Sequence, residues 1–151
     1  MEPTNLEQID VLTLLPQRPP FVMIDALTSL DEQHTTSRLT VRAGHLFLEP
    51  NGTLNPCALV ENMAQTCAAG MGYVNRYVDK GPVRLGFIGG IKHLSVLRPV
   101  RLGETLTTCV EVVGAILQMT LVHCTVSVGS EVIATGDLKI ALTDINARDD
   151  E

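Results

Sequence analysis

The segment Pro56–Tyr73 most constrains the fold, because its sequence is typical of a helix that is apolar on nearly every side. Asparagine caps helix N-termini and proline fits the first helical position, so Asn55 and Pro56 predict where this helix begins. Alanine and glycine are frequent in its first four turns, which lets neighbouring strands approach closely. A helix without a polar face is buried on most sides. We expect it to run from Pro56 to about Tyr77.

One carboxylate, Glu61, interrupts this apolar segment. Burying an ionised carboxylate is costly unless the group is paired or hydrogen-bonded, so a carboxylate retained there often takes part in chemistry. Glu61 is therefore the first candidate catalytic residue. The alternative is a structural carboxylate that is bonded to the backbone or to Gln65, one turn further on the same helix face.

The length of 151 residues and an apolar content of 45% favour one globular domain with its own core. We expect a flexible N-terminus over residues 1–8, a single domain over 9–143 and an acidic disordered tail over 144–151. The chain has no apolar run of about 18 residues and no basic start, which predicts neither a membrane span nor a secretion signal.

The cysteines predict reduced, buried thiols in a cytoplasmic protein. None of them forms a CxxC pair, and each lies in an apolar segment. Histidine and cysteine do not pair at ligand spacing, so we expect no metal site. The four cysteines are Cys57, Cys67, Cys109 and Cys124.

The formal charge of −6 disfavours a general role in nucleic-acid binding. The charge is unevenly distributed: Arg76–Arg101 holds six basic residues and one acid, whereas the rest of the chain holds five basic residues and sixteen acids. A local basic patch on an acidic protein can steer an acidic partner. The alternative is a solvated face without a partner.

Alternating apolar residues and polar turns predict several strands around the apolar helix. The expected elements are a short helix over Ile9–Leu15 and strands over Phe21–Leu30, Thr35–Arg42, Val83–Leu97, Thr105–Val113, Gln118–Val128 and Val132–Leu142. Val132 and Leu142 are among the side chains expected to point inward, and Val112 and Val128 are each expected to share one face of their strand with its alternate residues. The pattern predicts an α+β fold with an antiparallel sheet wrapped around one helix. A face or edge of that sheet should pair with another subunit.

Three stretches resemble the β-hydroxyacyl-(acyl-carrier-protein) dehydratases, over about residues 9–143. Leu14–Asp25 is similar to the family's Leu-Pro-His-Arg-x-Pro-Phe segment, Leu59–Gln65 to its Leu-Glu-x-Met-Ala-Gln helix, and Leu97–Leu106 to its Arg-Pro-Val-x-Pro-Gly-Asp-x-Leu turn. The resemblance implies a hotdog fold and a dimeric enzyme. The implied substrate is an acyl thioester on the pantetheine arm of an acyl carrier protein, and no metal or organic cofactor is implied.

The chain departs from the family pattern at two places. Gln17 stands where the family has histidine in the first stretch, and the family's His-Phe-Pro-Gly loop is replaced by His45–Pro56. In this loop the chain looks more like the divergent dehydratases of aryl-polyene-type biosynthesis.

The resemblance implies roles for individual residues. In the family, a loop histidine removes the proton beside the thioester carbonyl, and the helix carboxylate of the partner subunit protonates the departing hydroxyl. This implies Glu61 as the acid and His45 as the base, with a solvated loop histidine as the alternative for His45. The helix start at Pro56 and Cys57 would polarise the carbonyl through backbone N–H groups, and Gln65 would lie near the acid.

Further candidates lie along the chain after the helix. Gly89 and Gly90 would let a substrate arm pass close to the backbone, or they mark a β-bulge alone. His93 borders the substrate tunnel in the family, whereas His34 and His123 are expected to be bystanders. Met63, Met71 and Met119 are candidate tunnel residues or plain core. The candidates for docking the acidic carrier protein are Lys92, Arg98 and Arg101.

The main interpretation is a 3-hydroxyacyl-(acyl-carrier-protein) dehydratase that forms a 2-enoyl thioester in fatty-acid or polyene biosynthesis. One alternative is a non-catalytic hotdog subunit that binds acyl carrier protein or pairs with an active homologue. The other is a hotdog acyl thioesterase in which Glu61 activates water. A homodimer, a higher homo-oligomer and a heterodimer all remain open.

Overall fold

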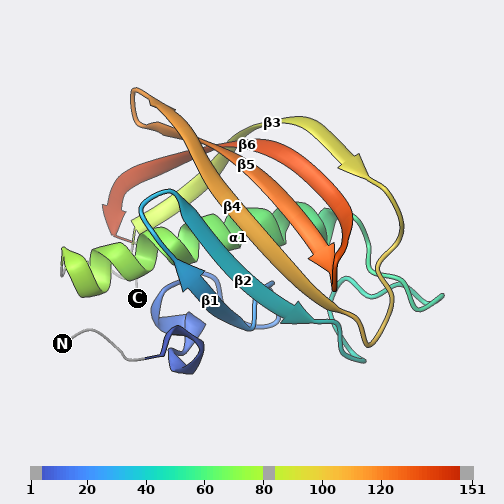
Figure 1. Cartoon of the computed structure of the whole chain (residues 1–151). Coiled ribbons are helices and arrows are strands. Elements are labelled where there is room, and N and C mark those ends of the chain that lie inside the picture. Colours follow the sequence, from blue (N-terminus) through green and yellow to red (C-terminus); the bar gives the residue numbers. More distant parts are fainter. Residues whose placement is uncertain (1–4, 80–83, 147–151) are drawn as a thin grey trace.

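A curved antiparallel sheet wraps around one long helix, α1 (Cys57–Tyr73), in the computed structural model, which describes residues 5–79 and 84–146 (Figure 1). The strands are β1 (Ala26–Leu30), β2 (His34–Thr40), β3 (Arg84–Val96), β4 (Thr105–Ile116), β5 (Met119–Val128) and β6 (Glu131–Asn146). Over the described residues they form one sheet in the order β1-β2-β4-β5-β6-β3. The expected α+β arrangement is confirmed.

Helix α1 begins where its sequence predicted. The Cys57 N–H donates to Oδ1 of Asn55 at 2.9 Å, which is the bond of an N-terminal cap. Beyond Tyr73 the chain continues in a π-helical turn, η3 (Val74–Val78), so the helical region ends near the expected position. A methyl group on Gly72 would collide with the backbone of Leu14, which explains why a small residue is needed there.

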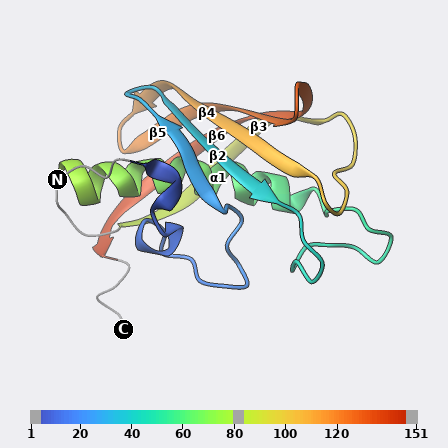
Figure 2. The same ribbon diagram turned by 60° about the horizontal axis from the view of Figure 1, so that its bottom comes forward.

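The expected short helix over Ile9–Leu15 is instead a pair of 3-10 turns, η1 (Leu6–Gln8) and η2 (Val11–Thr13). Asn5 and Asp10 cap these turns through their side chains. The turns lie beside α1 on the side that the sheet leaves uncovered (Figure 2). Leu14 and Leu15, which follow η2, pack with Ala69 of the helix in a small second core.

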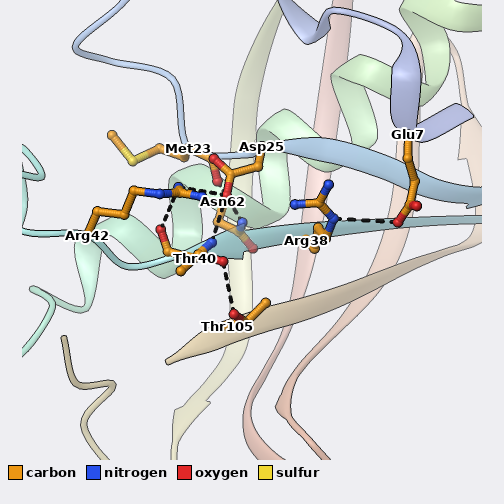
Figure 3. Close-up of polar contacts among 8 residues, drawn as sticks. All are labelled: Glu7, Met23, Asp25, Arg38, Thr40, Arg42, Asn62 and Thr105. Atoms are coloured by element: carbon orange, nitrogen blue, oxygen red, sulfur yellow. Dashed lines mark hydrogen bonds and ion pairs between the residues drawn. The ribbon is translucent and has the colours of Figure 1, made fainter. Parts of the chain in front are cut away.

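The first strand is shorter than expected: it starts at Ala26 rather than at Phe21. The backbone of Met23 bonds to helix side chains in place of a neighbouring strand. Its N–H donates to Oε1 of Gln65 at 2.7 Å. Its carbonyl accepts from Nδ2 of Asn62 at 2.8 Å, as Figure 3 shows. These long-range bonds hold residues 21–25 against α1 as an extended connection.

One expectation about burial in the strands was wrong. Val132 was expected to point inward but is 41% exposed, and Ile133 is buried in its place. Val112, expected on one face with Leu106, Thr108 and Val110, is 37% exposed, whereas those three are buried. The register of β5 against β6 shifts between Val126 and Ser127, which changes the inward set at that end of β6. Leu142 lies outside the residues whose side chains the structure describes.

The four cysteines are free thiols. Cys67 and Cys124 are buried as expected, and burial raises the pKa of each to about 12. Cys109 is half-buried. Cys57 is exposed at the start of α1, which corrects the expectation that every thiol is buried.

The edge strand β3 carries a line of exposed apolar side chains. Strand β3 pairs with β6 along one edge, and its other edge is unpaired among the described residues. The exposed apolar residues of β3 and the residue after it are Phe87, Ile91, Leu94, Val96 and Leu97.

The expected domain boundaries lie close to the ends of the structural elements. Strand β6 runs to Asn146, past the expected boundary at residue 143. The 3-10 turn η1 lies within the segment expected to be flexible. Residues 1–4 and 147–151, which belong to the two expected terminal segments, lie outside the described residues. No helix among the described residues is long and apolar enough to cross a membrane.

Candidate functional site

A cleft of about 310 Å³ runs along one face of α1 and η3, and Glu61 is the carboxylate that lines it. The helical residues recur every three or four positions, which places them on one side of the helix. They are Glu61, Ala64, Ala68, Met71, Gly72 and Asn75. Phe87, Ile88 and Ile140 of β3 and β6 line the opposite side. Glu61 is half-buried rather than sealed in the core, so a ligand in the cleft can reach it.

Gln65 holds the Glu61 side chain in place. Its Nε2 donates to Oε2 of Glu61 at 3.3 Å and to the carbonyl of Phe21 at 2.9 Å. Its Oε1 accepts from the Met23 N–H, and the Gln65 side chain is fully buried. The amide is therefore anchored on two sides, and the expected proximity of Gln65 to Glu61 is confirmed.

Gln17 lines the same cleft, from the loop after η2. Its Oε1 is buried and lacks a hydrogen-bond partner within the described part of the chain. The sequence had marked Gln17 only as a departure from the family's histidine. That substitution was the one sequence signal that could have placed it in the site.

His45 is half-buried in the loop before α1, and it is absent from the residues that line the Glu61 cleft. Its Nδ1 accepts from the Phe47 N–H at 3.2 Å, which places the proton of the neutral ring on Nε2. That Nε2 is buried and unpartnered over the described residues. Burial lowers the pKa of the imidazole, and the charge of Asp25 opposes the shift.

Asp25 is itself held by β2 and the residues after it. Its Oδ2 accepts from the Thr40 N–H at 2.9 Å and from Nη1 of Arg42 at 3.0 Å (Figure 3). This fixes a negative charge near His45. Within one chain, the structure therefore brings Gln65 and Gln17 to Glu61 but leaves the expected base outside the cleft.

The start of α1 has its backbone donors occupied. Besides the Asn55 cap on Cys57, the N–H of Ala58 donates to the Asn55 carbonyl at 2.9 Å, and the N–H of Leu59 donates to the Pro56 carbonyl at 3.0 Å. A thioester carbonyl would have to displace one of these acceptors. Pro56 also borders a second hollow of about 340 Å³, shared with Leu97 and neighbouring residues.

The β3 residues expected in the site, Gly89, Gly90 and His93, are not among those that line the cleft. Register shifts around Gly90 and between Lys92 and Ser95 show that the strand is bulged there. A methyl group on Gly89 would collide with the end of Met119 rather than face the cleft. His93 is 79% exposed, and its Nδ1 lies 2.9 Å from Oδ2 of Asp137 on the outer face of the sheet.

The expected carrier-docking residues differ in how their charge is compensated. Arg98 forms a bidentate pair with Glu104, with both N–O distances at 2.9 Å, and its Nε contacts Glu131 at 3.2 Å. The bond from Arg98 lowers the pKa of Glu104. Lys92 and Arg101 are exposed. Over the described residues no group of histidine, cysteine and acidic side chains is arranged to hold a metal ion.

The ApeP-like family, described as "ApeP dehydratase", matches residues 9–149 of this sequence. The chain belongs to the ApeP-like dehydratase family. It is also 31% identical over 145 residues to the 3-hydroxyacyl-[acyl-carrier-protein] dehydratase FabZ of Clostridioides difficile (strain 630), covering 93% of this chain and 98% of the relative. Dehydratases are hydro-lyases, so the ApeP-like chain falls in that enzyme class.

Solved structures confirm the hotdog fold of this ApeP-like chain. The dehydratase heterocomplex ApeI:P from Xenorhabdus doucetiae superimposes with a TM-score of 0.83 at 20% identity, covering 90% of this chain and 92% of that chain. A hypothetical thioesterase from Streptococcus pneumoniae TIGR4 has a TM-score of 0.60 at 11% identity, covering 80% and 86%. At these identities the likeness extends to the fold alone.

Proposed function

We propose that this ApeP-like protein removes water from a 3-hydroxyacyl thioester bound to acyl carrier protein and forms the 2-enoyl thioester. The observation that carries the proposal is Glu61, a half-buried carboxylate at an apolar cleft, held by a buried amide. An acid needs that combination of access and fixed geometry to protonate a leaving group. The name of the FabZ relative supports the choice of substrate.

The elimination requires one base and one acid. The base takes the proton from the carbon next to the thioester carbonyl, and that electron pair becomes the new C–C double bond. The C–O bond at the next carbon breaks, and Glu61 in its acid form gives its proton to the departing hydroxyl, which leaves as water. Gln65 stabilises the resulting Glu61 carboxylate by donating to it. The base and Glu61 then exchange protons with solvent.

His45 is the base in this proposal, and we place it in the cleft of a second subunit. The cleft of one chain lacks it. The apolar edge of β3, which pairs with no other strand over residues 5–79 and 84–146, supports association with another chain. The Phe47 N–H occupies Nδ1 of His45 in the single chain. The assembled site therefore requires that this hydrogen bond breaks or that the ring turns over.

A second candidate is a subunit that contributes Glu61 to a site completed by a different hotdog chain. The structural neighbour named as a heterocomplex favours this possibility. This second candidate predicts that dehydratase activity appears only when the second chain is added. Docking of the carrier protein is proposed for Lys92 and Arg101, because the charge of Arg98 is already neutralised within the chain.

The test is a product assay with the purified protein and with 3-hydroxyacyl and 2-enoyl thioesters. We expect absorbance from the enoyl thioester to appear without release of free thiol. Release of free acid and thiol would assign the thioesterase alternative. Acyl binding without turnover, in the presence of every homologous subunit tried, would assign the non-catalytic alternative.

A further inference from the structure

We propose that Gln17 binds the substrate: its side-chain carbonyl accepts a hydrogen bond from the 3-hydroxyl group and holds that oxygen toward Glu61. This inference rests on the proposed function and adds a residue that selects the hydroxylated substrate. Both side chains line the same cleft, although they come from the segment after η2 and from α1.

The first argument is the unpartnered oxygen. Oε1 of Gln17 is buried, and no hydrogen bond reaches it from the residues that the structure describes. Buried polar atoms in folded proteins are almost always hydrogen-bonded, because their lost hydration is otherwise uncompensated. An unpartnered oxygen on a residue that lines a ligand-sized cleft is therefore an acceptor that lacks a donor.

The second argument is the chemistry of the cleft. Apart from Gln17, Glu61 and Asn75, its lining is apolar, so it suits a hydrocarbon chain with few polar groups. A carbonyl oxygen accepts hydrogen bonds but cannot donate. It therefore favours a ligand with a hydroxyl group over a ketone, an alkene or a saturated chain.

The hydrogen-bond directions are compatible with the reaction. The substrate hydroxyl donates its hydrogen to Gln17, which leaves the lone pairs of its oxygen free to accept the Glu61 proton. When the C–O bond breaks, the departing water keeps its bond to Gln17. The amide gains and loses no atoms, so Gln17 orients the leaving group while Glu61 supplies the proton.

The backbone around Gln17 is held rigidly enough for this role. Nη1 of Arg18 donates to the carbonyls of Leu12 at 3.1 Å, Leu15 at 3.1 Å and Gln17 at 2.9 Å. Leu14 and Leu15 are fully buried just before it. The loop is thus fixed immediately before and after Gln17, and fixed contacts lower the cost of ordering a substrate.

The test compares Gln17→Met, which keeps the length of the side chain but removes the strong acceptor, with Gln118→Met at an exposed glutamine. Two quantities are measured: kcat/KM for a 3-hydroxyacyl thioester and the inhibition constant of the saturated acyl thioester of equal length. We expect kcat/KM to fall about 10- to 100-fold in Gln17→Met, the loss typical of one buried hydrogen bond. The saturated inhibitor and the Gln118→Met variant should stay within about twofold of the unsubstituted protein.

Equal weakening toward both ligands would assign Gln17 a structural role, and unchanged kinetics would remove it from the site. Gln17→His, which restores an acceptor, should recover most of the lost kcat/KM, and its thermal unfolding curve checks folding. If the unsubstituted protein has no turnover, either alone or with a second hotdog chain, the proposed function fails. Binding then tests Gln17 separately: the preference for the hydroxylated over the saturated thioester should disappear in Gln17→Met, and persistence of the preference would overturn the proposal.

Discussion

Both faces of the sheet carry polar side chains, which are buried on the inner face and largely exposed on the outer face. On the inner face, Ser37 of β2 and Thr108 of β4 meet Asn62 and Thr66 of α1, and all four are fully buried. Oγ of Ser37 lies 2.7 Å from Oγ1 of Thr66, which donates to the Asn62 carbonyl at 2.7 Å, and Thr108 donates to Oδ1 of Asn62 at 2.5 Å. These bonds close a polar network inside an apolar core.

On the outer face, histidines and carboxylates alternate in one row across the sheet. His34, Glu111, His123 and Asp137 lie directly opposite one another on β2, β4, β5 and β6. His34 lies 3.0 Å from Glu111, and His123 lies 2.6 Å from Asp137. Asp31 and His93 extend the row at its two ends. The row therefore holds His34 and His123, the two histidines expected to be bystanders.

The comparison shows that burial decides how much a polar contact contributes to the stability of the fold. A buried group that loses its partner stays dehydrated, whereas an exposed group exchanges its partner for water. Substitutions on the inner side of the sheet should therefore have large effects on activity or stability, and these effects should depend little on pH. Changes in the outer row should have small effects that depend on pH and salt.

The largest expected effect is on activity, from Glu61→Gln. The substitution keeps the size of the side chain but removes the acidic proton, so dehydration should fall by a factor of about 100 to 10,000. The measurement is the rate of enoyl thioester formation, by a heterocomplex if one is needed. Asp137→Asn, in the outer row, is the matched carboxylate control and should retain full activity. Comparable loss in both variants would contradict the assignment of Glu61 as the acid.

The next effect is on stability, from Asn62→Leu. It leaves the Met23 carbonyl and the Thr108 hydroxyl buried without their partner, which costs about 2–5 kcal/mol of the free energy of unfolding. Urea unfolding followed by circular dichroism measures the loss. Asn51→Leu, at an exposed loop position, is the control. A loss below about 1 kcal/mol would show that the inner network tolerates an unsatisfied group.

A smaller effect is expected from the pair Ser37 and Thr66. Ser37→Ala and Thr66→Val alone should each destabilise by about 1 kcal/mol. Thr66→Val leaves the Ser37 hydroxyl without this partner, and Ser37→Ala leaves the Thr66 hydroxyl with only its bond to the Asn62 carbonyl. The double variant removes both hydroxyls and should cost less than the sum. A double-mutant cycle from urea unfolding measures the coupling. Strict additivity would mean that the two hydroxyls stabilise the fold independently.

The smallest effect is the pH response of the outer row. Hydrogen bonds that His34 donates to Glu111 and Asp31 raise its pKa above its ordinary 6.5, and hydrogen bonds from His123 and His93 lower the pKa of Asp137 below 3.8. The stabilisation from His34 is complete below pH 6.5 and is lost as pH rises through the folded pKa. The stabilisation from Asp137 is present above pH 3.8 and is lost as pH falls through its folded pKa.

The melting temperature should therefore decrease between about pH 6 and pH 8 in low salt, and His34→Asn should reduce that decrease. The measurement is thermal unfolding of both proteins across this pH range. Identical pH profiles for the two proteins would show that the row makes no titratable contribution to the stability of the fold.

Local patterns predicted most of the secondary structure. The Asn55-Pro56 start and the small apolar residues identified helix α1, and alternation identified β4, β5 and most of β6. The start of β1 was missed because the backbone of Met23 is bound by Asn62 and Gln65, about forty positions away in the chain. No local sequence pattern near Phe21 indicates such a long-range contact.

The sequence by itself determined that a lone carboxylate lies on a buried helix, with Gln65 one turn away, because helical spacing alone places them together. Only the tertiary structure decided that Gln17 and Glu61 line the same cleft, that His45 lies outside it, and that the other histidines align on the outer face of the sheet. Those relations depend on strand register and loop path. Both are set by contacts between distant segments, and neither leaves a periodic signal in the chain.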